Sequence, residues 1–132
     1  MANPLEGCTL YYFGLVGLGE PIRMALRRKG IKFTDHHISM DFSPEGAAAR
    51  NKIKTDHGLP EHVGFPILKL ADGTVMNQSR AILNFVGHHT DLYPTCPKER
   101  FFVDHVIELV NEARGDIMPT MLKNDLKSIS GT

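Results

Sequence analysis

The stretch FPILKLADGTVMNQSRAI, residues 65–82, predicts two short strands and the start of a helix. Residues 66–70 are largely apolar, Asp72-Gly73 is a typical hairpin turn, and Val75-Met76 begins a returning strand. A helix is expected to begin at Ser79, with that serine as its N-cap, because apolar residues then recur at helical spacing. The stretch is therefore an antiparallel hairpin that leads into a helix.

The residues before this hairpin predict a strand, a helix and a second strand. CTLYYF, residues 8–13, is a run of β-branched and aromatic residues that ends at Gly14. A helix is expected from Glu20-Pro21 to a basic last turn and a stop at Gly30, and residues 32–38 predict the second strand. Because a strand–helix–strand unit precedes a hairpin, we expect an α/β fold with a mixed four-stranded sheet in βαβαββα order.

Two further helices are predicted outside these units. Ser43-Pro44-Glu45 can start a helix that runs to Lys54, and a last helix is expected from Pro97 to about Met118, with a polar tail beyond Pro119. The last helix carries an apolar stripe of Phe102, Val106, Leu109 and Ala113. The predicted organisation is a sheet domain over 1–88, a linker over 89–96, and the start of a truncated helical domain with its tail over 97–132.

Composition limits the classes of function. Lys plus Arg and Asp plus Glu number 15 each, so the net charge is zero, which argues against general binding to nucleic acid or anionic membranes. No apolar run approaches the roughly 20 residues of a membrane span, and the N-terminus lacks the features of a secretory signal, so the cytoplasm is the default location.

The two cysteines are expected to be free thiols. The seven histidines show no metal-ligand spacing, and no metal site is expected.

Three short stretches contain candidate functional residues. Strand alternation places Tyr12 on the opposite face from Tyr11 and Phe13, so one phenol should pack while the other reaches a cleft. The Phe65-Pro66 bond is either an ordinary trans bond at the start of a strand or a cis bond that turns the Phe65 backbone toward a peptide-like ligand. The third stretch, residues 77–81, is either a capped helix start or an anion site. Each stretch alone is explained by ordinary structure.

Together the stretches resemble the N-terminal domain of the glutathione transferases. The motifs are LYYF (10–13), GLGEPIR (17–23), the pattern FP-IL-x-L-x-DG-x-x-x-x-QS-x-AI and GHHTDLYP (87–94). The resemblance runs from about Thr9 to about Met118 and is greatest to the tyrosine-type classes, sigma-like and mu-like. It implies a thioredoxin-like domain with glutathione as co-substrate, followed by the first helix of an all-helical domain. A thioredoxin-type oxidoreductase is disfavoured, because Cys8 precedes the strand and the following loop has no cysteine.

The resemblance also assigns roles to individual residues. Tyr12 would donate its hydroxyl to the glutathione sulfur, with Tyr11 as a non-catalytic neighbour. Arg50, Lys52 and Lys54 are candidates for pairing with the glycyl carboxylate, because the register of this long loop is open. The remaining implied contacts are the Phe65 backbone before a cis Pro66 for the cysteinyl part, Gln78 and Ser79 for the γ-glutamyl carboxylate, Asp104 for the γ-glutamyl amine across a dimer, and Phe42 for the glycyl end.

Departures from the family pattern leave two functions open. Val16 leaves the loop after the first strand without its usual cation, and Phe65 replaces a small aliphatic residue. The resemblance implies that these 132 residues supply only the first helix of the all-helical domain, so we expect no complete electrophile pocket from them. The chain is therefore either a transferase-type module that activates glutathione once the missing helices are supplied, or a non-catalytic docking subunit. In both cases a homodimer or hetero-assembly through the 97–118 helix is expected.

Overall fold

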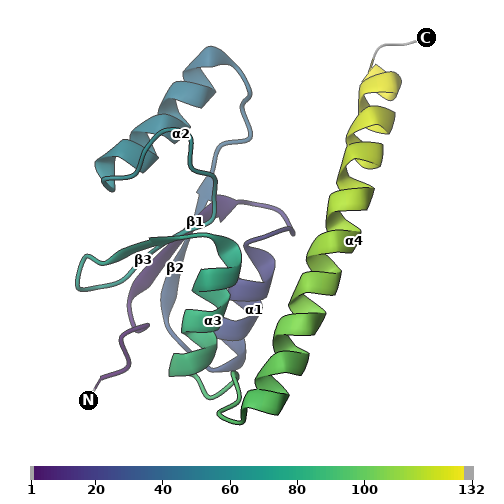
Figure 1. Ribbon diagram of the computed structural model, residues 1–132. Helices are drawn as coiled ribbons and strands as arrows, with labels where there is room; N and C mark the ends of the chain where they lie inside the picture. The colour runs from purple at the N-terminus through teal and green to yellow at the C-terminus, as the bar shows by residue number, and fades with distance from the viewer. Residues whose placement is uncertain (1, 130–132) are drawn as a thin grey trace. The chain divides into compact units, whose positions relative to one another are not determined.

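The computed structural model describes residues 2–129, which form two units: one runs through Tyr93 and the other begins at Pro94 (Figure 1). The first unit holds a sheet and three helices, and the second holds one long helix. The elements are β1 (Cys8–Phe13), α1 (Glu20–Arg28), β2 (Phe33–Ile38), α2 (Pro44–Asp56), β3 (Ile67–Lys69), β4 (Val75–Asn77), α3 (Ser79–His89) and α4 (Pro97–Ile129).

The sheet has the predicted mixed topology. Its strand order is β2-β1-β3-β4, with β1 and β2 parallel and the other two pairs antiparallel. The β3–β4 connection is the expected hairpin turn, in which Gly73 has a φ of 92° and the Asp72 side chain accepts a hydrogen bond from the Thr74 N–H at 2.8 Å. The prediction of a four-stranded mixed sheet with flanking helices is therefore confirmed.

The core lies between one face of the sheet and the pair α1 and α3. Figure 1 shows these two helices side by side against the sheet, with α2 away from them. Alternate residues of β1 point into this core, as the alternation predicts. The fully buried core side chains include Leu5, Cys8, Leu10, Ile22, Leu26, Leu68, Ile82 and Val86.

Helix α1 begins and ends where the sequence predicts. Pro21 occupies its first turn, and Glu20 lies at the positive end of the helix dipole. Gly30 follows the helix with a φ of 67°, a conformation that glycine adopts without steric cost, and its N–H donates to the Arg27 carbonyl at 3.0 Å. One result was not predicted: Arg23 is buried in α1 with Ile22 and Leu26.

The start of α3 differs from the prediction. The N-cap is Gln78, not Ser79, and it makes no side-chain capping hydrogen bond. Gln78 has a φ of 74°, a left-handed conformation that is uncommon outside glycine. The prediction that Ser79 caps this helix is therefore wrong, because Ser79 is already the first helical residue.

Helix α4 is longer than predicted. It runs to Ile129 and contains Pro119 within it, so the prediction of a helix end near Met118 followed by a polar tail is wrong. A proline removes one backbone hydrogen bond from a helix, and α4 continues through Pro119 despite that loss. Among the residues that the structure describes, no helix is long and apolar enough to cross a membrane.

Candidate functional site

The strand registers bring three of the predicted residues to one end of the sheet. Tyr11 pairs with Ile67 on β3, and Ile67 pairs with Asn77 on β4. One step further along each chain places Tyr12, Pro66 and Gln78 at the same end of three successive strands, with Pro66 between the other two. Residues far apart in the sequence, from a strand end, a strand start and a helix start, therefore line one end of the sheet.

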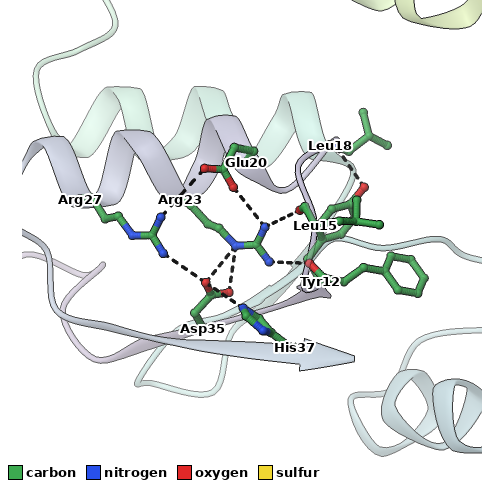
Figure 2. A network of polar contacts seen from close by, with 9 residues as sticks. Tyr12, Leu15, Leu18, Glu20, Arg23, Arg27, Asp35 and His37 are labelled. Carbon is green, nitrogen blue, oxygen red and sulfur yellow. Dashed lines mark hydrogen bonds and ion pairs between the residues drawn. The ribbon is translucent and has the colours of Figure 1, made fainter. Parts of the chain in front are cut away.

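Tyr12 is buried under the loop that joins β1 to α1. Its side chain is 5% exposed, and its hydroxyl oxygen accepts a hydrogen bond from the backbone N–H of Leu18 at 3.0 Å (Figure 2). Two loop glycines lie against the ring: a Cβ on Gly17 would be 2.6 Å from the Tyr12 hydroxyl, and a Cβ on Gly19 would be 2.4 Å from its Cδ1. Side chains at both positions would collide with Tyr12, so the glycines permit its placement.

Tyr11 lies on the other face of the sheet. Its ring centroid is 4.8 Å from that of His36 on β2 and 4.8 Å from that of His57 at the end of α2. The Nδ1 of His57 is 2.6 Å from the carbonyl oxygen of Ile53, a partner within its own turn. The two adjacent phenols are therefore in different environments, and only Tyr12 contacts the β1–α1 loop through its hydroxyl.

The Phe65-Pro66 bond is cis. Pro66 is fully buried, and the half-buried Phe65 ring packs edge-on against Phe13, with a centroid distance of 6.1 Å. Lys54 approaches the same ring, with its Nζ at 5.4 Å from the Phe65 centroid. Phe65, just before β3, therefore contacts the end of β1 through Phe13 and α2 through Lys54.

The three candidate cations on α2 have different surroundings. Lys54 donates to the Glu61 carbonyl at 2.7 Å and lies beside Phe65. Arg50 donates to the carbonyl oxygens of Ser39 and Asp41, and its guanidinium lies over the Phe42 ring at 5.4 Å. Lys52 forms an ion pair with Asp56 at 2.5 Å. Lys54 and Arg50 thus each lie over the ring of a predicted site residue, Phe65 and Phe42 respectively, and Lys54 is the one beside the start of β3.

The remaining predicted site residues lie on other segments of the chain. Phe42 is 76% exposed on the segment between β2 and α2. Ser79 is half-buried at the first position of α3, beside the exposed Gln78. Asp104 lies on α4, in the second unit, where it is half-buried, and its predicted role stays a prediction.

A network of polar contacts beside Tyr12 was missed by the sequence analysis. It centres on Arg23, which is 3% exposed and binds Asp35 on β2 and two carbonyl groups of the β1–α1 loop (Figure 2). In the sequence, the one signal for this network was Arg23 itself, an arginine between apolar residues of an amphipathic helix. An open cavity of about 310 Å³ borders this network; it is lined by Gly14, Leu15, Val16, Glu20, Arg23, Arg27, Asp35 and His37.

The two cysteines have opposite electrostatic surroundings. Burial raises the pKa of the Cys8 thiol to about 11, whereas the backbone N–H groups of Glu99 and Lys98 lower the pKa of the exposed Cys96 thiol at the start of α4. Within the described part of the chain, no group of three or more His, Cys, Asp or Glu side chains is placed to hold a metal ion.

Comparison with known proteins identifies relatives of this chain. Over 110 residues, the chain is 30% identical to glutathione S-transferase 1 of Ascaris suum, a match that covers 83% of this chain and 48% of that protein. It is 36% identical over 101 residues to glutathione S-transferase A2 of Mus musculus, covering 76% and 41% respectively. The chain belongs to the glutathione S-transferase family. No family model matches it.

The fold comparison leads to the same family. The crystal structure of the glutathione S-transferase from Ascaris lumbricoides superposes with a TM-score of 0.69 at 27% identity, covering 87% of this chain and 51% of that one. The chain therefore spans about half the length of the glutathione S-transferases it matches. The narrower assignment to a sigma-like or mu-like class stays a prediction.

Proposed function

We propose that this chain is a glutathione-binding transferase module in which Tyr12 activates the glutathione thiol. The observation that carries the proposal is the hydrogen bond from Leu18 N–H to the Tyr12 hydroxyl oxygen. This bond occupies one lone pair of that oxygen, so the hydroxyl proton is directed elsewhere, toward a ligand at this edge of the sheet. Family membership and the three-strand register around Tyr12 support the same assignment.

The thiolate is the nucleophilic form of glutathione, and a hydrogen bond from a neutral phenol stabilises it. In the proposed step, the Tyr12 hydroxyl donates to the sulfur while the thiol proton leaves to solvent. Lowering the thiol pKa by about two units requires about 2.7 kcal/mol of preferential stabilisation of the anion. A charge-assisted hydrogen bond, together with the N-terminal end of α1, is of the right magnitude.

The rest of the tripeptide would be held by the residues gathered at the same edge. The Phe65 backbone before the cis Pro66 would pair with the cysteinyl part. The γ-glutamyl carboxylate would bind at the start of α3, where Gln78 and Ser79 lie beside the N–H groups of the helix.

The glycyl end would lie toward α2. Lys54 is the preferred partner for the glycyl carboxylate, because of the three cations it is the one that lies beside Phe65, next to the cis Pro66. Phe42 would line this end with its exposed ring. Asp104 would act through an assembly that brings α4 to the γ-glutamyl amine of a second chain.

The direct test is an ultraviolet difference titration of glutathione bound to the chain, which reports the thiolate as a function of pH. For the wild type, we expect a titration midpoint about two pH units below that of free glutathione. Tyr12→Phe should return the midpoint to the free value, which corresponds to an about hundredfold change in the equilibrium constant between thiol and thiolate. Tyr11→Phe is the matched control and should leave the midpoint unchanged.

The alternative, a non-catalytic docking module, predicts a different outcome. It is favoured by the apolar side chains exposed along α4, which would suit a protein partner. Glutathione binding without a shift of the thiol midpoint would support this alternative. Absence of heat in a calorimetric titration at millimolar glutathione would refute the binding proposal itself.

A further inference from the structure

Arg23 is a buried cation with an unusually complete set of partners. Its Nε lies 3.0 and 2.9 Å from the two carboxylate oxygens of Asp35, and one terminal nitrogen lies 3.2 Å from a Glu20 carboxylate oxygen. A charge that is 3% exposed is costly unless it is paired and hydrogen-bonded. Asp35 and Glu20 meet that requirement, so the sheet and α1 fix the guanidinium in one place.

The same guanidinium binds the backbone of the β1–α1 loop. One terminal nitrogen donates to the Phe13 carbonyl at 2.7 Å, and the other donates to the Leu15 carbonyl at 2.8 Å (Figure 2). The first carbonyl ends β1 and the second lies at the start of the loop, whereas Leu18, whose N–H donates to the Tyr12 hydroxyl, lies near the loop's end. Arg23 therefore holds the loop from which Tyr12 receives its hydrogen bond.

Arg23 also lies beside Tyr12 itself. Its Cζ is 5.5 Å from the centroid of the Tyr12 ring, within the range of a cation–π contact. A second arginine, Arg27, contacts Asp35 at 3.4 Å and Glu20 at 4.0 Å, but its side chain is 58% exposed. Of these two arginines, Arg23 is the one that joins the acidic residues, the loop backbone and the tyrosine ring.

We propose that Arg23 is a positioning residue for thiol activation, which acts by fixing the β1–α1 loop and its Leu18 N–H against the Tyr12 hydroxyl. This inference rests on the proposed role of Tyr12 and goes beyond it. A purely structural role, in which Arg23 only ties α1 to β2, predicts a loss of stability without any effect on the bound thiol.

The test compares Arg23→Met, Arg23→Lys and the control Arg28→Met in the full chain. Methionine keeps an unbranched apolar side chain but removes every donor, whereas lysine keeps the charge and loses the fork that reaches two carbonyls. Arg28 is exposed on the same helix and provides a matched substitution. Each variant is titrated with glutathione, and the ultraviolet signal of the bound thiolate is followed against pH.

For Arg23→Met, we expect the thiolate midpoint to rise by about one pH unit, a tenfold change in the thiolate equilibrium, with glutathione affinity changed by less than about threefold. Arg23→Lys should show a smaller rise in the same direction, and Arg28→Met none. Exchange of the Leu18 amide hydrogen, measured by nuclear magnetic resonance, should be faster in both Arg23 variants. If Arg23→Met does not fold, Arg23→Lys alone decides the result.

The titration distinguishes a failure of the Arg23 proposal from a failure of the Tyr12 proposal on which it rests. A wild-type chain that binds glutathione without forming thiolate refutes the role of Tyr12, and the Arg23 proposal with it. A lowered midpoint in the wild type that stays the same in the folded Arg23 variants refutes the Arg23 proposal alone. In that case, Arg23 has only the structural role.

Discussion

Gly19 shows at the scale of one residue how the loop and Tyr12 depend on each other. Its φ of −81° is open to any amino acid, so the backbone does not require glycine here. The requirement is steric, because an added Cβ would lie 2.4 and 2.5 Å from ring carbons of Tyr12 and 2.9 Å from its Cβ. The last atom belongs to the rigid base of the side chain, which cannot rotate away.

We therefore expect Gly19→Ala to destabilise the fold by about 1–3 kcal/mol, the usual cost of overpacking a filled site. It should also weaken the Leu18–Tyr12 hydrogen bond and raise the thiolate midpoint of bound glutathione. Chemical denaturation measures the first effect. The control is Gly64→Ala, where the added Cβ meets nothing within 4 Å and stability should change by less than about 0.5 kcal/mol.

Cys8 and Cys96 give a second prediction at the residue scale. The lowered pKa of Cys96 increases its thiolate fraction at neutral pH, whereas Cys8 is buried and stays protonated below its raised pKa of about 11. At pH 8, iodoacetamide should label the native chain once, at Cys96, and should label Cys8 only after unfolding. Peptide mass spectrometry reads both sites, and labelling of native Cys8 at a comparable rate would contradict this assignment.

At the scale of elements, the sequence predicted the strand and helix boundaries that are determined by neighbouring residues in the chain. The boundaries of β1 are correct because CTLYYF is a β-forming run that ends at a glycine, and α2 begins with Ser43 as its N-cap. The cap of α3 was misplaced because the left-handed backbone of Gln78 arises at the junction with β4 and has no local signal. Likewise, the burial of Arg23 depends on Asp35 across the sheet, so helical periodicity alone does not reveal it.

The start of α2 provides a prediction for one element. The Ser43 hydroxyl accepts from the Gly46 N–H at 3.2 Å and donates to Asp41 Oδ2 at 2.7 Å. Ser43→Ala should destabilise the chain by about 1 kcal/mol, the typical effect of losing an N-cap. Thr55→Ala, in the last turn of the same helix, removes only hydroxyl bonds to carbonyls of its own helix and should have less than half that effect.

The loss of this cap should also have a pH signature. Backbone and side-chain hydrogen bonds from Ser43 lower the pKa of the Asp41 carboxyl below its ordinary value of 3.8. A lowered carboxyl pKa contributes stability that is present above the unfolded value and is lost as pH falls through the folded value. Ser43→Ala should therefore cost more at pH 6 than at pH 2 in urea titrations, and equal costs at both pH values would contradict the Asp41–Ser43 bond.

At the scale of the whole molecule, the main feature is the apolar surface that α4 exposes. This helix exposes large apolar side chains along most of its length, between 38% and 61% of each side chain: Phe101, Phe102, Val106, Leu109, Val110, Ile117, Met118 and Met121. Fully burying an exposed side chain of this kind is worth about 1.5–3 kcal/mol, and covering the exposed part of several of them should make α4 associate with another surface at sufficient protein concentration. The same argument supports the predicted assembly through this helix.

We expect sedimentation equilibrium to show concentration-dependent self-association of the full chain. Replacing Phe102, Val106 and Leu109 together by serine should weaken that association by at least about a hundredfold, which corresponds to about 2.8 kcal/mol. Because these residues belong to the second unit, the thermal unfolding of the sheet unit should not change. Glutathione affinity should fall, because Asp104 of a second chain would no longer be brought to the γ-glutamyl amine. A chain that stays monomeric to millimolar concentration would contradict self-association and leave a different protein as the partner of α4.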